Sequence, residues 1–217
     1  MSMGVNYDIP FYANTLDGTH CVQAVFKMIT EHFRPDLVLS FEEWERISHK
    51  RAGGWTWTMS GLIWLKEAGF EVENVEYIDY HRFSSEGVAF LEELWGIDVA
   101  SIQGEKTNIP EEQEIAKLFI EEIEPKVRLP NADDLKNMLE NGYLLAVTVN
   151  SRILNAREGY AGHLVVVKGY DDTGFFLNDP GLPPLENRHV DYALFTRAWA
   201  YPNDNARNLA AIRGAKQ

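Results

Sequence analysis

The sequence predicts an α+β fold in which helices come first and an antiparallel sheet follows. Up to Glu140, apolar residues recur mainly at helical spacing. After Tyr143, the chain changes to apolar runs joined by a short polar turn, which is typical of antiparallel strands. The 217 residues, 45% of them hydrophobic, are enough to build a well-buried core. Because predicted helices precede predicted strands instead of alternating with them, α+β is favoured over α/β.

The first predicted helix begins at the only cysteine of the chain, Cys21. Residues 7–15 are expected to be extended, and Gly18-Thr19-His20 is expected to form a turn. Cys21 lies beside the apolar stripe of its helix, so we expect it to face a cleft. The stripe consists of Val22, Val25, Phe26 and Ile29.

Two further helices and a strand are predicted next. Ser40 and Glu43 have the spacing of a capping box and predict a helix over about residues 41–50. Met59, Leu62 and Ile63 predict a third helix, which Gly69 ends. The alternating residues 70–80 then predict a strand.

Residues 83–125 form a more acidic block, for which helices are predicted at 88–95 and 111–123 with a loop at 105–110. This block is either an insertion or lid, or a set of helices on the outside of the core. Residues 1–205 are expected to form one domain that includes this block, and residues 206–217 a peripheral C-terminal tail.

The C-terminal half is expected to supply most of the sheet. Asn131 caps a predicted helix that Asn141-Gly142 stops. A turn at 171–174 joins two of the predicted strands. The expected elements are a helix at 132–140, strands at 143–149, 163–170 and 175–178, and a strand or extended segment at 192–199.

Composition excludes several classes of function. The net charge of −13 argues against binding to nucleic acid or anionic membranes, which needs clustered lysine and arginine. One cysteine excludes an internal disulfide framework and a multi-cysteine zinc site. We expect no metal or other cofactor, because His32, His49, His81 and His189 lack ligand spacing. No long apolar run predicts a signal or membrane segment, so a cytoplasmic protein is expected. The sequence carries no signal for oligomeric state.

Cys21 is the best candidate for a catalytic group. A thiol at a helix N-terminus faces unpaired backbone N–H groups and the positive end of the helix dipole, both of which stabilise thiolate. A lone cysteine is more often a small buried hydrophobe, so catalysis requires a histidine and an acid elsewhere in the chain. The adjacent His20 is a poor base, because neighbouring side chains diverge on a helix. His163 opens a predicted strand, where a polar residue can stand at the edge of a cleft.

The sequence pattern leaves two candidates for the residue that orients His163. A simple hairpin turn at 171–174 would place Asp179 opposite Val166, facing away from His163, and would put Asn178 on the face of His163. A bulge near Gly169 would bring Asp179 back to that face.

Two segments resemble C39-like cysteine peptidases, a family with a papain-like fold. The first is Pro10-Phe11-Tyr12-Ala13-Asn14 with Asp17-Gly18-Thr19-His20-Cys21, similar to the family's P-[FY]-x-x-Q and D-x-x-C-G patterns. The second and closer match, residues 162–171 followed by Asn178-Asp179-Pro180, resembles H-[FW]-V-V-V-x-G-Y-D…N-D-P. The resemblance covers most of the chain except residues 83–125.

The resemblance implies Cys21 as nucleophile, His163 as general base and acid, and Asp179 as the residue that orients His163. It places the oxyanion-hole amide at Asn14, where the family has the longer glutamine. Val22 stands where the family has glycine after the nucleophile.

The resemblance thus implies a papain-like thiol hydrolase, or an acyl transferase, acting on a peptide or amide. Trp55, Trp57, Gly162 and Asn178 are the candidates for the substrate cleft, although packing alone also explains the tryptophans. The alternative is a catalytically weak or inactive homologue that binds a peptide in the same cleft.

Overall fold

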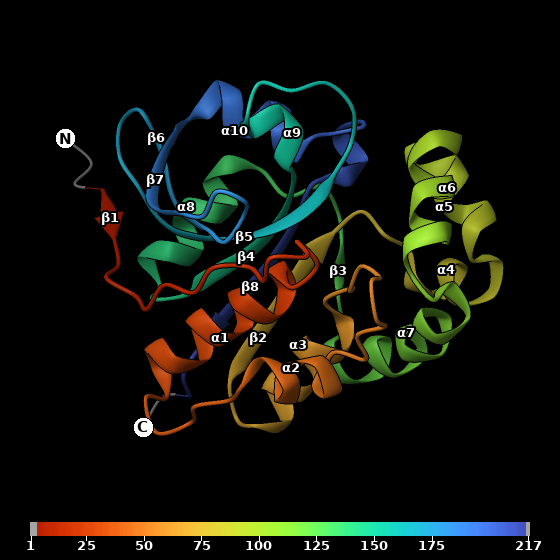
Figure 1. Cartoon of the computed structure of the whole chain (residues 1–217), viewed down its shortest axis with the longest axis horizontal. Coiled ribbons are helices and arrows are strands. Elements are labelled where there is room, and N and C mark those ends of the chain that lie inside the picture. The colour runs from red at the N-terminus through yellow and green to blue at the C-terminus, as the bar shows by residue number, and fades with distance from the viewer. Residues whose placement is uncertain (1–3, 216–217) are drawn as a thin grey trace.

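The computed structural model describes residues 4–215 and shows one twisted sheet between two layers of helices (Figure 1). This part of the chain contains ten α-helices, one 3₁₀ helix and eight strands. Helices α1–α7 precede most of the sheet in sequence, as predicted for an α+β chain. The helices are α1 Cys21–Phe33, α2 Phe41–Ile47, α3 Met59–Glu67, α4 Tyr80–Glu86, α5 Val88–Trp95, α6 Ile97–Lys106, α7 Ile109–Ile123, α8 Ala132–Glu140, α9 Ser151–Leu154, α10 Tyr192–Trp199 and η1 Asp204–Ala206.

The sheet has the strand order β3-β2-β8-β4-β5-β6-β7, and β1 pairs with β5 outside this path. All pairings are antiparallel except the short parallel contact between β2 and β3, so the sheet is mixed. The strands are β1 Val5–Asn6, β2 Glu71–Glu76, β3 Lys126–Val127, β4 Leu144–Asn150, β5 Gly162–Tyr170, β6 Gly174–Asp179, β7 Leu185–Asp191 and β8 Asn208–Arg213.

Alternating side chains of the central strands divide the core into two halves. Leu164 and Val166 of β5 pack with α1, α3 and the helices of residues 80–123. Val165 and Val167 pack on the opposite face with α8 and α10. Because successive side chains of β5 point to opposite faces of the sheet, this strand packs against both layers of helices.

The local signals in the sequence fix several element ends. The Ser40–Glu43 capping box is present at the start of α2, and the Asn131 side chain accepts from two backbone N–H groups at the start of α8. Gly69 follows α3 with a φ of +91°, a conformation that favours glycine. These short-range predictions are confirmed because each depends on contacts within one turn of chain.

The prediction that residues 206–217 form a peripheral tail is wrong for β8. This strand pairs with β2 along its whole length and with β4 at its C-terminal half. Leu209, Ala210, Ala211 and Ile212 are all buried. The segment is short and follows a polar stretch, so its sequence does not reveal that two distant strands enclose it.

Residues 192–199 form helix α10, and the prediction of a strand there is wrong. The Asp191 side chain accepts a hydrogen bond from the Leu194 backbone N–H and caps the helix. Phe195, Ala198 and Trp199 are buried, a helical spacing that the aromatic composition of the segment concealed. Strand β7 and helices α4 and α6 were not predicted, and the expected loop at 105–110 is mostly the end of α6 and the start of α7.

The acidic block forms helices α4–α7, and its interior is part of the main core. Phe83 of α4 and Phe119 of α7 are fully buried and pack around Tyr80. α7 lies against α3 and α4. These helices therefore contribute buried side chains to the same core as the N-terminal helices.

The stability of the folded protein is expected to depend on pH through the buried carboxyl of Glu112 in α7. Burial, reinforced by the charge of Glu111, raises the pKa of Glu112 to about 8, although the Trp57 backbone N–H acts to lower it. The unfolded chain loses this proton near pH ~4.3. Between these values the folded state binds a proton that the unfolded state lacks, so stability falls as pH rises from about 4.3 through 8. We expect Glu112→Gln to remove much of this loss.

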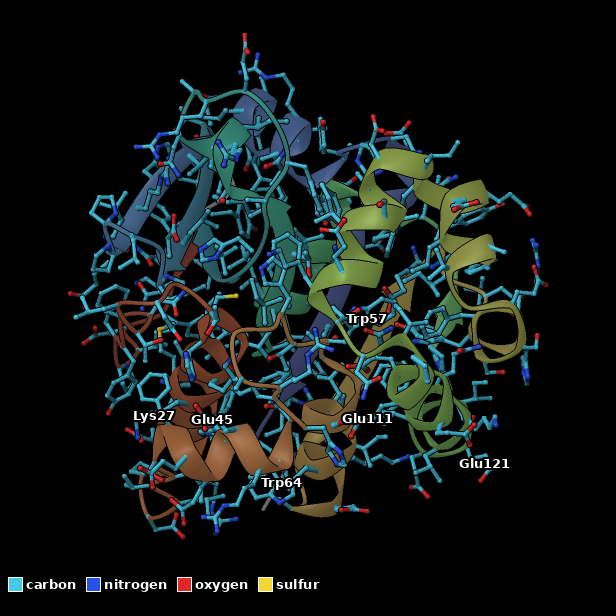
Figure 2. The ribbon with its side chains drawn as sticks, turned by 45° about the vertical axis from the view of Figure 1, so that its right-hand side comes forward. Lys27, Glu45, Trp57, Trp64, Glu111 and Glu121 are labelled. Carbon is cyan, nitrogen blue, oxygen red and sulfur yellow. The ribbon has the colours of Figure 1, made fainter. Side chains whose placement is uncertain are left out.

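Urea unfolding at about pH 5 and about pH 8 measures the effect. The wild-type free energy of unfolding should decrease between the two, by on the order of a few kcal/mol more than in Glu112→Gln. Glu121→Gln, on the exposed side of the same helix, is the matched control and should behave like wild type (Figure 2). Equal losses in all three proteins would contradict the assignment.

Candidate active site

Cys21 is the first residue of α1 and opens into a cavity between α1 and the sheet. It is a free thiol of intermediate exposure. The helix continues into the core through Ala24, Val25 and Met28, which are fully buried. The apolar stripe of α1 thus fixes the helix against β5 and leaves its N-terminal end, with the thiol, at the cavity.

His163 lies at the start of β5 and contacts both Cys21 and an acid. Its Nε2 is 2.7 Å from Asp179 Oδ1, and it hydrogen-bonds to the Cys21 thiol. His163 and Asp179 are both almost fully buried. The structure therefore brings together the three residues that the sequence analysis singled out, in the order Cys21, His163, Asp179.

A β-bulge decides between Asp179 and Asn178. Val166 pairs with Asn178 and Val167 with Leu177, but Gly169 pairs with Phe176. Lys168 is thus the extra residue, and the shift turns Asp179 to the face of His163. Asn178 faces the other way and is fully buried, with its Nδ2 near the Pro10 carbonyl and its Oδ1 accepting from the Asn187 backbone N–H.

The bulge lies next to the residues of β5 that pair with β1. The Lys168 ammonium donates to Asn6 Oδ1 and to the Tyr7 carbonyl, at 2.9 and 2.7 Å. Asn6 pairs with Gly169, where a Cβ would lie 2.2 Å from the Val5 carbonyl oxygen. A glycine is therefore needed at 169 for β1 to approach.

Arg188 of β7 completes the chain of polar contacts and was not predicted. Its Nη1 donates to Asp179 Oδ2 at 2.8 Å and to Asn155 Oδ1 at 3.1 Å. Its Nη2 donates to the Leu154 carbonyl. Asp179 also accepts from the Gly181 backbone N–H at 2.9 Å. The buried carboxylate is therefore held on both oxygens, and a sequence pattern gives no signal for an arginine recruited from the next strand.

These contacts favour the ion-paired form of Cys21 and His163. Burial acts to raise the pKa of Cys21, but the hydrogen bond and charge of His163 outweigh it and lower the pKa. Burial likewise acts to lower the pKa of His163, but the bonds to Asp179 and Cys21 raise it to about 10. Burial opposes ionisation of Asp179 as well, yet His163 holds its pKa below the usual value. At neutral pH the arrangement favours thiolate, imidazolium and carboxylate.

Asn14 is fixed next to the start of α1. Its Oδ1 accepts from the His20 backbone N–H at 2.7 Å, and its own backbone N–H donates to the Pro180 carbonyl at 2.8 Å. Its amide Nδ2 has no hydrogen-bond partner in residues 4–215. The His20 ring is occupied elsewhere, by Thr15 and Glu45, which agrees with its exclusion as a base for Cys21.

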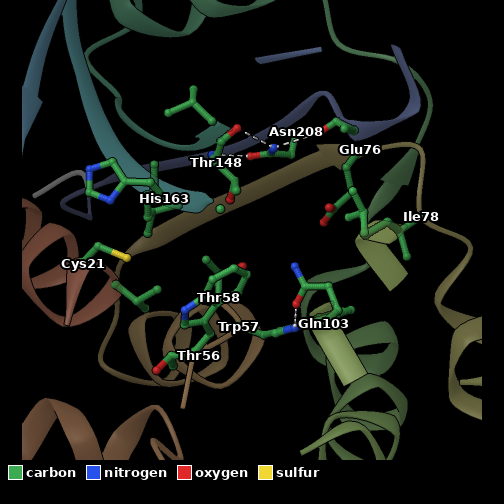
Figure 3. Close-up of a pocket in the computed structure, with 18 of the residues that line it drawn as sticks. Cys21, Thr56, Trp57, Thr58, Glu76, Ile78, Gln103, Thr148, His163 and Asn208 are labelled. Carbon is green, nitrogen blue, oxygen red and sulfur yellow. Dashed lines mark hydrogen bonds between the residues drawn. The ribbon is translucent and has the colours of Figure 1, made fainter. Parts of the chain in front are cut away.

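A cavity of about 140 Å³ extends from Cys21 and His163 along the sheet (Figure 3). Its floor includes the small side chains Ala146 and Ala210, which leave room above β4 and β8. Helices α5 and α6 line its far side with Trp95, Val99 and Gln103. The acidic block therefore forms one wall of the cavity.

Three of the four residues expected to line the cleft do so. Trp55, Trp57 and Gly162 border the cavity, whereas Asn178 lies beneath α1 and does not. Trp57 belongs to the loop before α3 and packs against the helices of the acidic block (Figure 2). It stacks on Phe83 and donates to Gln103 Oε1 at 3.2 Å, so its packing and cleft roles coexist.

Two other features of residues 4–215 bear on the classes of site considered above. No group of three histidine, cysteine or acidic side chains is arranged to hold a metal ion in this part of the chain. None of the described helices combines the length and the apolar character that crossing a membrane requires.

The comparison with known proteins yields structural likeness only. No protein-family model and no curated protein matches the chain. The peptidase domain of Streptococcus ComA, a bifunctional ABC transporter involved in a quorum-sensing pathway, has a TM-score of 0.50 and 11% identity, over 96% of this chain and 98% of that one. A protein assigned as a C39-like peptidase from Bacillus anthracis has a TM-score of 0.34 and 16% identity, over 48% and 57%. The first likeness confirms the C39-like, papain-like α+β fold that the sequence resemblance predicts.

Proposed function

From the fold of a C39 peptidase domain, we propose that this protein is a thiol hydrolase that cleaves peptide or amide bonds at Cys21. The observation that carries the proposal is the contact of the Cys21 thiol with His163, whose Nε2 is bonded to the doubly held Asp179 carboxylate. Such a set matches the requirements of nucleophilic catalysis, namely a nucleophile, a base and a group that orients the base. The peptidase domain with which the chain shares its fold supports a peptide as substrate.

The chemistry follows from the ion pair. The Cys21 thiolate attacks the carbonyl carbon, a carbon–sulfur bond forms, and the carbonyl oxygen becomes an oxyanion. His163 gives its proton to the leaving amine as the carbon–nitrogen bond breaks. Water then attacks the thioester with His163 as base, the carbon–sulfur bond breaks, and the carboxylic acid leaves. If an amine took the place of water, the same intermediate would give acyl transfer.

Two donors are proposed for the oxyanion. The first is the backbone N–H of Cys21 at the N-terminus of α1, and the second is Asn14 Nδ2, which is left without a protein partner when Asn14 Oδ1 binds the His20 N–H. Loss of one such donor costs about 10²–10³ in rate in other hydrolases. An Asn14→Ala variant therefore reports directly on this assignment.

Acylation by p-nitrophenyl acetate tests the proposal without knowledge of the natural substrate. We expect a burst of p-nitrophenolate, a mass gain of one acetyl group on Cys21, and slow return to the free protein. Cys21→Ser is the matched control and should give no burst. A peptide library incubated with both proteins then shows whether amides are cleaved. A wild-type protein that forms no acetyl-Cys21 would instead be a module that binds in the cleft without catalysis.

A further inference from the structure

Glu76 is a buried carboxyl that the proposed catalysis does not use. It is the last residue of β2 and is only 9% exposed. Its Oε1 accepts from Asn74 Nδ2 at 2.5 Å and from the Tyr80 hydroxyl at 2.6 Å. Its Oε2 has no hydrogen-bond partner in residues 4–215. Because Glu76 lines the same cavity as Cys21, this oxygen is available to a molecule bound there.

The cavity places the Glu76 carboxyl across from the nucleophile. In Figure 3, Cys21 and Glu76 point into the cavity from opposite sides, with Thr148 and Asn208 between them on the sheet. The Thr148 backbone N–H donates to Asn208 Oδ1 at 2.8 Å, and Asn208 Nδ2 donates to the Thr148 carbonyl at 3.1 Å. These two residues therefore offer no charge to compensate that of Glu76.

The rest of the lining is suited to a positive group. Among the described residues around the cavity, Glu76 is the one carboxyl side chain, and none is lysine or arginine. The charge of His163, which also lines the cavity, is paired with Cys21 and Asp179. Aromatic rings make up much of the wall, and the Tyr160 ring contacts both Trp55 and Tyr201. A carboxylate and aromatic faces in one cavity attract cations through ion pairing and through the ring quadrupoles. The net charge of −13 also attracts cations over a longer range.

We propose that this cavity binds an alkylammonium or guanidinium group of the substrate on Glu76 Oε2, while the scissile carbonyl lies at Cys21. The position of the scissile carbonyl at Cys21 rests on the proposed function, whereas the cation site at Glu76 does not. A volume of about 140 Å³ is close to the ~150 Å³ of an engineered cavity that holds benzene, so it accommodates a group of roughly that size. Burial raises the pKa of Glu76 when the cavity holds no cation, and a bound cation would favour its charged form.

Disulfide formation at Cys21 measures this preference without any hydrolysis. A short and a long aminoalkyl methanethiosulfonate are each compared with the uncharged alkyl reagent of the same length. The thiolate attacks the sulfenyl sulfur, a sulfur–sulfur bond forms, and methanesulfinate leaves with the electron pair. The rate ratio of charged to uncharged reagent, divided by the same ratio for free cysteine, gives the selectivity of the cavity.

We expect a selectivity of about tenfold for at least one chain length in the wild type, and its loss in Glu76→Gln. Gln is isosteric and can still accept from Asn74 and Tyr80. Glu105→Gln, which removes one charge from an exposed position of α6, is the matched control and should retain the selectivity. Equal selectivity in wild type and Glu76→Gln would overturn the proposal.

A measurement on the wild type keeps the proposal testable if Glu76→Gln does not fold. n-Butylamine should slow the alkylation of Cys21 by iodoacetamide, and n-butanol at the same concentration should not. Equal effects of the two compounds would contradict a cation site. Protection by n-butylamine alone, without acetylation of Cys21 by p-nitrophenyl acetate, would support the cation site and contradict the hydrolase. Acetylation of Cys21 without selective protection would support the hydrolase and contradict the cation site.

Discussion

Replacing His163 by alanine is expected to shift the reactivity of Cys21 to higher pH and to lower its alkylation rate near pH 6 by about 10²-fold. In the wild type, burial raises the pKa of the thiol, but His163 reverses this through its hydrogen bond and charge. Without His163, only the backbone N–H groups of Val22 and Leu164 oppose burial. The pKa should then rise to or above the free-cysteine value of ~8.5.

The measurement is the rate of iodoacetamide alkylation against pH. His189→Ala is the matched control, because His189 is an exposed histidine of β7 whose ring contacts Asp171 and Phe176 instead of the site. It should leave the curve unchanged. Asp179→Asn keeps a hydrogen-bonding side chain but removes the charge, so it should give a smaller shift than His163→Ala. An unchanged inflection in His163→Ala would rule out the thiolate–imidazolium pair.

Ending the chain after residue 205 is expected to abolish folding. The deletion removes β8, whose six residues pair with Glu71–Glu76 on one side and whose C-terminal half pairs with β4 on the other. Leu209 and Ile212 are fully buried, and the loss of one such side chain costs about 2–5 kcal/mol in other proteins. The total free energy of unfolding of a protein is about 5–15 kcal/mol. The loss of the whole strand and its packing is therefore expected to exceed it.

Near-ultraviolet circular dichroism and urea unfolding check this outcome. A chain that ends after Arg213 keeps β8 and is the matched control, which should unfold cooperatively like the full chain. Leu209→Ala in the full chain should lower the free energy of unfolding by about 2–5 kcal/mol. A cooperatively folded chain of residues 1–205 would show that the sheet does not require this interior strand.

The candidate site was only partly accessible from sequence. Cys21 and His163 were identifiable because each lies at a predictable helix or strand end. Asp179 depended on a one-residue bulge in β5, which determines whether Asp179 or Asn178 faces His163. The bulge lies where β1 pairs with β5, a contact between distant parts of the chain. Arg188 and Glu76 reach the site from strands whose positions next to it depend on tertiary pairing.

The sequence by itself determined the α+β class, the capped ends of α2 and α8, and the place of the thiol at a helix start. These features depend on side chains within about one helical turn or one strand pair of each other. Only the tertiary structure decided that residues 208–213 lie inside the sheet, that residues 192–199 are helical, and that Asp179 is held by Arg188. These outcomes depend on contacts with segments far away along the chain. Local patterns of polarity do not indicate which distant segment will make those contacts.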